Sequence, residues 1–309
     1  MDPLELRDRL RGAIAFPITP FQGDLSLDGD GFARNMERLV GSGVVAIVVA
    51  GGTGEFHSLT PDEIVRLCAI AVEASAGRTP VIVGVGLNAS LATALARRCE
   101  AAGADGLLLM PPAYGRAEDD GFFAYYSAIA QSVGIGVFPY ARDHAVLSPA
   151  LVARLARLPN VIAFKDGHGD IRLWKRIREH VGDGIRWLAG VGDDMAPQYF
   201  TAGAEGYTSS IANLYPDVAV RLFELARSDA LLAEELVQQH IQPLYSMRPR
   251  RRGYEVTTIK AAMTLQGRPA GPVRPPLSPL ADEDAVDLEH ALVRLAEAGR
   301  PLGAVAART

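Results

Sequence analysis

Residues 44–50 read Val-Val-Ala-Ile-Val-Val-Ala, and the turn Gly-Gly-Thr-Gly-Glu follows at residues 51–55. An uninterrupted apolar run of this length, ended by glycines, is typical of a strand in a parallel sheet that is covered on both faces. Parallel strands are joined by long crossover connections, which are usually helices. This stretch therefore predicts an α/β fold.

Seven further runs of the same apolar kind lie at residues 12–18, 81–85, 106–110, 135–138, 161–164, 185–189 and 206–209. Amphipathic segments separate the runs, and four of these segments begin with residues that favour helix starts: Thr60-Pro61-Asp62-Glu63, Asn88, Ser148-Pro149 and Tyr215-Pro216-Asp217. Eight strand–helix units suit a closed (β/α)8 TIM barrel. An open, doubly wound sheet of six strands would leave two of the units unexplained.

The chain continues beyond the eighth unit. We expect helices near residues 231–245, 254–266 and 282–298, with a proline-rich connector at 269–279 between the last two. The predicted organisation is a barrel over residues 1–228 and a C-terminal helical extension over residues 229–309. The extension is expected to pack on the barrel as part of one structural unit and to contact other subunits.

The composition narrows the class of protein. The chain has 309 residues, 49% of them hydrophobic, and a formal net charge of −5, which gives no reason to expect a nucleic acid or an anionic membrane as partner. The basic run 248–252 is read as a solvated face or as a clamp for a small anion. Cys68 and Cys99 offer no disulfide framework, and the first residues lack an apolar signal core. With no apolar run of membrane-spanning length, we expect a cytoplasmic protein.

Catalytic groups of a barrel enzyme lie at the carboxyl ends of the strands. Lys165 follows the apolar run 161–164, so its amine is expected inside the barrel mouth, where burial favours the uncharged form. An uncharged amine is the nucleophile that a Schiff base requires. Taken alone, the pattern fits equally well a structural lysine that pairs with Asp166 or Asp170.

Three residues with hydroxyl side chains lie at or just after the ends of other predicted strands. Tyr140 closes the strand next to that of Lys165, and its phenol can pass protons between an imine, a leaving hydroxyl and water. Thr53 and Tyr114 are candidate links in a hydrogen-bond chain to that phenol. Each of the three, taken singly, is more commonly a packing residue than a catalyst.

The turn at residues 51–55 is a candidate site for a small anion. Gly52, Thr53, Gly54 and Glu55 bring backbone amides and one hydroxyl to a point without bulky side chains, which suits the carboxylate of a keto acid. A nucleotide phosphate loop is the competing interpretation, but the lysine of a Walker motif is absent. Residues 84–86 read Gly-Val-Gly and lack the third glycine of a dinucleotide fingerprint.

Nothing in the sequence indicates a metal or a cofactor. The six histidines show no ligand spacing, and adjacent residues such as Asp193-Asp194 rarely point the same way. We therefore expect no metal ion and no cofactor, which is consistent with Schiff-base chemistry.

Several of these segments resemble the dihydrodipicolinate synthase / N-acetylneuraminate lyase family, from about residue 12 to the C-terminal helices. They are Phe-Pro-Ile-Thr-Pro-Phe at 16–21, the turn at 51–55, Tyr140 and Phe-Lys-Asp at 164–166. A dehydratase branch of that family is indicated by Gly-Gly-Thr-Gly-Glu-Phe at 51–56, Tyr-Ala-Arg-Asp-His-Ala at 140–145, Phe-Lys-Asp-Gly-His-Gly-Asp-Ile at 164–171, Arg-Gly-Tyr at 252–254 and Ile-Lys-Ala at 259–261.

The resemblance implies that Lys165 forms the Schiff base, that Tyr140 relays protons and that Thr53 binds the substrate carboxylate. The sequence departs from the synthases in three places. Gly52 replaces a second threonine, Ala113-Tyr114 replaces a pair of tyrosines, and Ala145 replaces an arginine. Arg142 is the candidate that holds a distal carboxylate instead, because its fork matches carboxylate geometry.

The implied activity is dehydration and decarboxylation of 5-dehydro-4-deoxyglucarate, a keto sugar diacid, to 2,5-dioxopentanoate. Ser209 and Ser210, after the last strand, are candidates for binding its hydroxyls or distal carboxylate. A pyruvate-dependent class I aldolase or synthase would use the same lysine. A third hypothesis is a catalytically inactive barrel that only binds keto acids. The resemblance also implies a homo-oligomer, a tetramer or a dimer.

Overall fold

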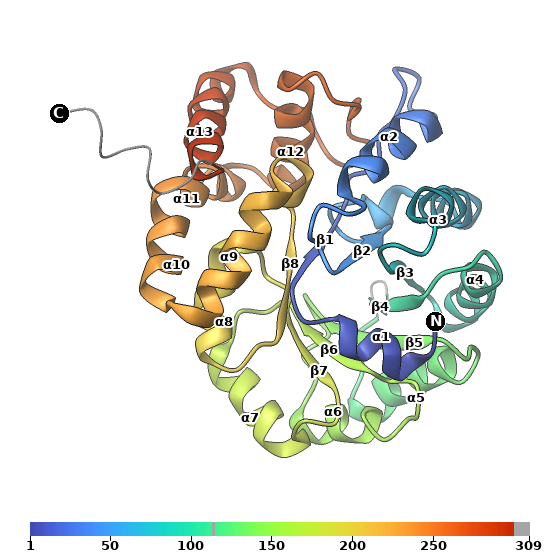
Figure 1. The fold of residues 1–309 in the computed structure, drawn as a ribbon. Coiled ribbons are helices and arrows are strands. Elements are labelled where there is room, and N and C mark those ends of the chain that lie inside the picture. Colours follow the sequence, from blue (N-terminus) through green and yellow to red (C-terminus); the bar gives the residue numbers. More distant parts are fainter. Residues whose placement is uncertain (113–114, 300–309) are drawn as a thin grey trace.

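The computed structural model of the protein describes residues 1–112 and 115–299. Eight parallel strands close a barrel in chain order (Figure 1). Their bounds are β1 Ala13–Ala15, β2 Ala46–Val49, β3 Val81–Leu87, β4 Gly106–Pro112, β5 Gly136–Ala141, β6 Ala163–Asp166, β7 Arg186–Ala189 and β8 Gly206–Ser209. The closure is made by β8, which pairs with both β7 and β1. The predicted (β/α)8 TIM barrel with additional C-terminal helices is confirmed.

The helices surround this barrel. They are α1 Pro3–Arg9, α2 Gly29–Leu39, α3 Pro61–Ser75, α4 Ala89–Ala101, α5 Asp119–Ala130, α6 Pro149–Leu155, α7 Ile171–Val181, α8 Ala196–Thr201 and α9 Pro216–Ser228, followed by α10 Ala230–Leu236, α11 Gln242–Tyr245, α12 Tyr254–Leu265 and α13 Ala285–Ala298. All four predicted helix starts are confirmed. Thr60 forms a capping box with Glu63, while Asn88 and Ser148 accept backbone N–H bonds as N-caps.

The inside of the barrel is filled with apolar side chains. Ile14, Ile82, Leu108, Phe138 and Leu188 meet there, each 0% or 1% exposed. The amino-terminal end of the barrel is closed by α1, whose Leu6 and the following Leu10 belong to the same buried cluster. Glycines at the starts of β4 and β5 make room for this contact, since a Cβ on Gly106 would lie 2.5 Å from Leu6 Cδ2.

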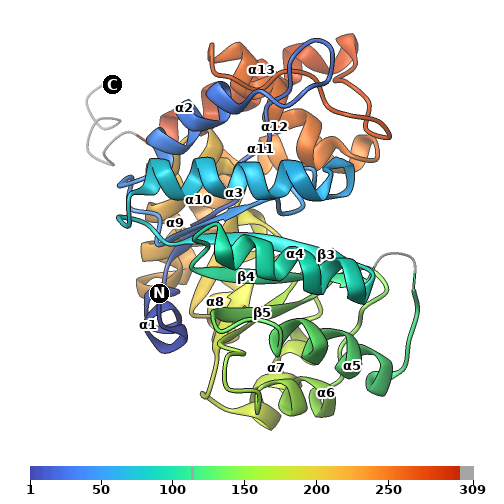
Figure 2. The same ribbon diagram turned by 90° about the vertical axis from the view of Figure 1, so that its right-hand side faces the viewer.

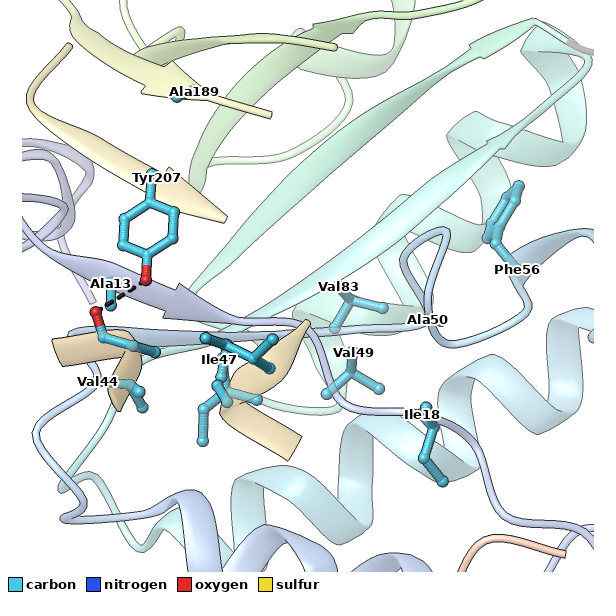
Figure 3. Close-up of a cluster of buried hydrophobic side chains, with 14 of the residues drawn as sticks. Ala13, Ile18, Val44, Ile47, Val49, Ala50, Phe56, Val83, Ala189 and Tyr207 are labelled. Atoms are coloured by element: carbon cyan, nitrogen blue, oxygen red, sulfur yellow. Dashed lines mark hydrogen bonds between the residues drawn. The ribbon is translucent and has the colours of Figure 1, made fainter. Parts of the chain in front are cut away.

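A second core lies between the strands and the helices. Figure 3 shows part of it, with Ile47, Val49 and Val83 from neighbouring strands β2 and β3. Tyr207 of β8 belongs to this layer, and its hydroxyl donates to the Ala219 carbonyl of α9 at 2.8 Å. Alternate residues of each strand therefore serve the inner and the outer core, as expected for a sheet buried on both faces.

The strands β3 to β6 extend two or three residues further than their apolar runs. As a consequence, Tyr140 and Lys165 lie inside β5 and β6, not just beyond them. The residues that follow the four runs are Gly86, Pro111, Pro139 and Lys165, and each strand continues past them. The end of an apolar run therefore does not mark the end of the strand.

The C-terminal helices gather on one side of the barrel, as the orange to red segments of Figures 1 and 2 show. The predicted helix at 231–245 is present but is interrupted by a π-helical turn over Val237–Ile241. Pro243 explains the interruption, because it has no N–H for the carbonyl four residues earlier. The Gln242 N–H instead bonds Val237 O, five residues back. The division at residue 228 between barrel and extension stays a prediction.

Among the described residues, no helix is both long enough and apolar enough to span a membrane.

Candidate active site

The position of Lys165 follows from the alternation of β6. Ala163 belongs to the inner core and Phe164 to the outer core, so Lys165 points inward again. Its neighbour across the sheet is Tyr140 of β5, which is the registered partner of Lys165. Phe138 and Tyr140 both belong to the inner core, and the two reactive side chains therefore meet at the carboxyl end of the barrel.

The amine of Lys165 lies in an aromatic environment. Its Nζ is 3.6 Å from the ring centroid of Tyr140 and 4.3 Å from that of Phe16, and the side chain is only 3% exposed. Burial is the main reason that the pKa of Lys165 is well below its usual value, and the positive charge of Arg142 lowers this pKa further. The charge of Asp166 acts in the opposite direction but is outweighed. The site therefore favours an uncharged amine.

The structural alternative for Lys165 is not supported in the described part of the chain, where no carboxylate forms an ion pair with it. The carboxylate of Asp166 accepts bonds from the Tyr199 hydroxyl and the Gly169 N–H. Asp170 is the N-cap of α7, where it accepts two backbone N–H bonds. Both candidate partners are therefore used elsewhere.

Two glycines provide the space for these side chains. A Cβ on Gly190, just after β7, would lie 2.6 Å from Cε of Lys165. A Cβ on Gly167, just after β6, would lie 2.8 Å from the hydroxyl oxygen of Tyr140. Real Cβ atoms do not approach this closely, so both positions require glycine for the observed placement of Lys165 and Tyr140.

A cavity of about 860 Å³ opens above the two residues. Seven of the predicted site residues line it: Gly52, Thr53, Tyr140, Arg142, Lys165, Ser209 and Ser210. They come from the ends of four different strands and the turns that follow them. This volume is sufficient for a small organic substrate.

The proposed proton relay is only partly assembled. Burial raises the pKa of Tyr140, so the phenol stays protonated near neutral pH. None of the hydrogen bonds found among residues 1–112 and 115–299 joins Thr53 to Tyr140. Tyr114, the third predicted link, lies outside the described residues. Tyr140 thus carries a protonated phenol, and no hydrogen bond links it to Thr53 in the described part of the chain.

Gly54 and Glu55 do not line the cavity, which corrects their prediction as substrate-binding residues. Glu55 is 0% exposed, and its carboxylate lies 2.5 Å from Nζ of Lys260 on α12. It also accepts the Arg274 N–H at 2.9 Å. The Gly54 carbonyl accepts the hydroxyl of Thr19. The turn at 51–55 therefore points one end into the cavity and anchors the other to the C-terminal segment.

The anion nest at this turn is likewise smaller than predicted. The amide of Glu55 donates to Gly52 O and the amide of Phe56 donates to Gly51 O, so both are used within the turn. Only the part around Gly52 and Thr53 faces the cavity.

Sequence reasoning missed one whole wall of the cavity. It is lined by Gln242 and Tyr245 of α11, Arg248 of the connection and Glu255 at the start of α12. The available indications were Pro243 inside a predicted helix and the basic run at 248–252. The C-terminal segment therefore contributes directly to the cavity, in addition to covering the barrel.

A hydrogen-bond network fixes this wall to the ends of β7 and β8. The Tyr245 hydroxyl donates to the Asp193 carboxylate at 2.5 Å, and the Ser210 N–H donates to the same oxygen at 3.1 Å. Arg248 donates to Ser210 Oγ at 2.5 Å. Asp193 is 0% exposed and serves this network, while Asp194 lines the cavity. No cluster suited to a metal ion is found among the described residues.

A closed (β/α)8 barrel with a buried amine beneath a large cavity at its carboxyl end defines a barrel enzyme. The sequence matches the Dihydrodipicolinate synthetase family over residues 9–295. The chain belongs to this family.

Relatives support the same placement. The chain is 40% identical over 300 residues to a "Probable 5-dehydro-4-deoxyglucarate dehydratase" of Bradyrhizobium diazoefficiens, covering 96% of each chain. It is also 40% identical to a protein of the same name from Rhizobium rhizogenes, covering 93% of this chain and 97% of the relative. Among solved structures, dihydrodipicolinate synthase from Oceanobacillus iheyensis superposes with a TM-score of 0.90 at 28% identity, covering 96% of this chain and all of the other.

Proposed function

We propose that the protein is a decarboxylating dehydratase that converts 5-dehydro-4-deoxyglucarate to 2,5-dioxopentanoate, carbon dioxide and water through a Schiff base on Lys165. The observation that carries the proposal is the buried amine of Lys165 beneath the cavity. The names of the 40%-identical relatives supply the substrate.

The first step is condensation of the uncharged Lys165 amine with the ketone carbon of the substrate. The carbonyl oxygen leaves as water, and a protonated imine remains on Nζ. The imine withdraws electrons from the adjacent methylene, so that carbon loses a proton and an enamine forms. The low pKa of Lys165 makes this step possible near neutral pH, where an ordinary lysine is almost entirely protonated.

The enamine then expels the β-hydroxyl, which takes up a proton and leaves as water. Tyr140 is the donor we assign to this proton, because burial keeps its phenol protonated and its ring lies against Nζ. The conjugated imine that results accepts the electron pair of the distal C–C bond as carbon dioxide is lost. The resulting dienamine takes up a proton at carbon, and its enol tautomerises to an aldehyde. Hydrolysis of the imine by water then restores the amine and releases 2,5-dioxopentanoate.

The remaining residues are assigned by position. Gly52 and Thr53 face the cavity and are the proposed site of the carboxylate next to the ketone. Ser209 and Ser210 line the cavity at the end of β8 and are the proposed contacts for substrate hydroxyls.

The proposal is tested by borohydride reduction in the presence of 5-dehydro-4-deoxyglucarate, followed by peptide mass mapping and an assay of carbon dioxide. The chain has only three lysines, Lys165, Lys175 and Lys260, so the modified residue is identified without ambiguity. We expect the adduct on Lys165 and the release of carbon dioxide.

An aldolase or synthase remains the second candidate, because the superposed solved structures are synthases. That candidate would give an adduct with pyruvate and a new or broken carbon–carbon bond without carbon dioxide. Product analysis separates the two activities, since pyruvate without carbon dioxide contradicts the dehydratase.

A further inference from the structure

Arg248 is a cation held at the cavity surface. It lies in the 3₁₀ turn Arg248–Arg250, between α11 and α12, and its side chain lines the cavity. The guanidinium carbon is 3.5 Å from the ring centroid of Tyr245, and one terminal nitrogen donates to Ser210 Oγ at 2.5 Å. Within the described residues, its buried Nε has no hydrogen-bond partner.

The neighbouring arginines of the basic run are used differently. Arg250 lies 2.7 Å from carboxylate oxygens of both Asp284 and Asp287, and Arg251 pairs with Glu283. In the part of the chain that the structure describes, no carboxylate lies within ion-pair distance of Arg248. An aromatic ring and a hydroxyl thus fix the direction of this guanidinium but leave its charge and several donors available.

The loop after β7 connects this cation to the amine. Gly190 borders the methylenes of Lys165, and two residues later Gly192 borders Tyr245, whose hydroxyl would lie 3.0 Å from a Cβ built there. Two residues of extended chain span about 7 Å. A linear diacid whose ketone is bound at Lys165 can therefore extend along this loop towards Arg248.

We propose that Arg248 binds the distal carboxylate of the substrate and thereby selects a keto diacid over a keto monoacid. This inference rests on the proposed function and assigns the distal end of its substrate. The charged fork of arginine matches a carboxylate, and such charge-assisted bonds are among the stronger ones in proteins.

Arg142, the arginine predicted for this role, is better placed to act at the other end. Its Nη1 donates to Gly167 O at 3.3 Å, beside Tyr140, and its Nε donates to Asp143 at 3.4 Å. Its charge also lowers the pKa of Lys165, so it lies close to the amine. The two arginines of the cavity thus act at its two ends.

Asp194 provides the competing explanation for Arg248. Its carboxylate also lines the cavity, and one of its oxygens is buried without a partner within the described residues. Burial raises the pKa of Asp194, whereas the charge of Arg248 lowers it. If Arg248 served only to balance Asp194, its removal would not affect the choice between diacid and monoacid.

The test measures the concentration that half-saturates the borohydride-trapped adduct on Lys165. The two probes are 5-dehydro-4-deoxyglucarate and 2-keto-3-deoxygluconate, in which a hydroxymethyl group replaces the distal carboxylate. In Arg248→Gln, we expect the value for the diacid to rise about 10- to 100-fold. The value for the monoacid should stay within about threefold. Because the carboxylate is bound before it is lost, KM should rise while kcat changes little.

The matched control is Arg142→Gln, which should change the values for both probes by a similar factor. Arg248→Lys keeps the charge without the fork and should show a smaller loss for the diacid alone, which keeps the test usable if Arg248→Gln does not fold. Equal changes for both probes in the Arg248 variants, or a loss of preference only in Arg142→Gln, would overturn the inference. Absence of any adduct in the unmodified protein would instead overturn the proposed function.

Discussion

The cavity has two unlike walls. The wall from β5 and β6 carries Tyr140 and Lys165, which are fixed by strand register and by the packing of the inner core. The wall from the C-terminal segment carries Tyr245 and Arg248, which are fixed by side-chain hydrogen bonds to the ends of β7 and β8. The residues proposed for catalysis are thus held by main-chain pairing. The residues on the wall proposed to select the substrate are held by a network of side-chain hydrogen bonds.

This difference suggests how a barrel can change its substrate without changing its chemistry. Substitution in a strand would disturb the backbone ladder and the core together. A helix-connecting segment such as the one between α11 and α12 can change its side chains while the barrel pairing stays intact. The two walls are nevertheless linked, because Glu55 in the turn after β2 pairs with Lys260 of α12.

The largest effect is expected at the strand wall. Lys165→Ala removes the only group proposed to form the imine, so kcat/KM for 5-dehydro-4-deoxyglucarate should fall by about 10⁴-fold or more. The adduct should also disappear from the peptide map. Lys175→Ala, an exposed position on α7, is the matched control and should leave activity nearly unchanged. Substantial activity in Lys165→Ala would show that the strand wall does not carry the chemistry.

The next largest effect is expected at the ion pair between Glu55 and Lys260, which links the two walls, and it is an effect on stability. Lys260→Met leaves the buried Glu55 carboxylate without its cation, and breaking such a pair typically costs about 3–5 kcal/mol. Urea unfolding should show this loss of stability. Burial lowers the pKa of Lys260 to about 8, so this side chain is mostly charged at pH 7, and the measurement should be made there.

A double variant checks the cause of that loss. Glu55→Gln combined with Lys260→Met removes both charges, and it should be more stable than Lys260→Met alone. A double variant that is no more stable than the single one would mean that packing around Lys260, not the uncompensated carboxylate, causes the loss.

Tyr140→Phe separates the ring from the hydroxyl. The ring on which Nζ lies is retained, so the borohydride adduct should still form. The proposed proton donor is lost, and kcat should fall by about 10²-fold. Single-turnover rates with trapping at each time point would measure both steps, and an unchanged kcat would remove Tyr140 from the mechanism.

The smallest predicted effect is a shift in pH dependence. The neutral fraction of Lys165 increases with pH, so the rate of adduct formation should rise with pH and level off well below the usual lysine pKa. Arg142→Gln removes a positive charge that lowers this pKa, so the pKa should rise and the midpoint should move to higher pH by about one unit or less. A midpoint that moves to lower pH would contradict the assigned direction.

The two walls also differ in how far the sequence predicts them. The eight apolar runs predicted the barrel. The positions of Lys165 and Tyr140 at the ends of two neighbouring runs predicted that both side chains lie at the barrel mouth. Glu55 was misplaced because a five-residue turn can direct its last side chain away from the cavity, and periodicity carries no information about a left-handed residue such as this one, with φ of 58°.

The C-terminal wall was missed for a different reason. Tyr245 and Arg248 line the cavity after a π-helical turn over Val237–Ile241 in the preceding helix. These contacts join residues far apart in the chain, and local patterns in one sequence do not specify them. The basic run at 248–252 was interpreted as a solvated face or as a clamp for a small anion, and the sequence did not show which of its arginines would face the cavity.

Leu6 of α1 and the following Leu10 fill one end of the barrel, so the described residues leave no passage to the interior from that side. Substrate and products must then pass through the same opening, at the carboxyl end of the barrel. The proposed products, carbon dioxide and 2,5-dioxopentanoate, would have to leave by the route on which the next substrate arrives. Bound product should therefore compete with substrate for this opening, and the reaction rate should fall as product accumulates.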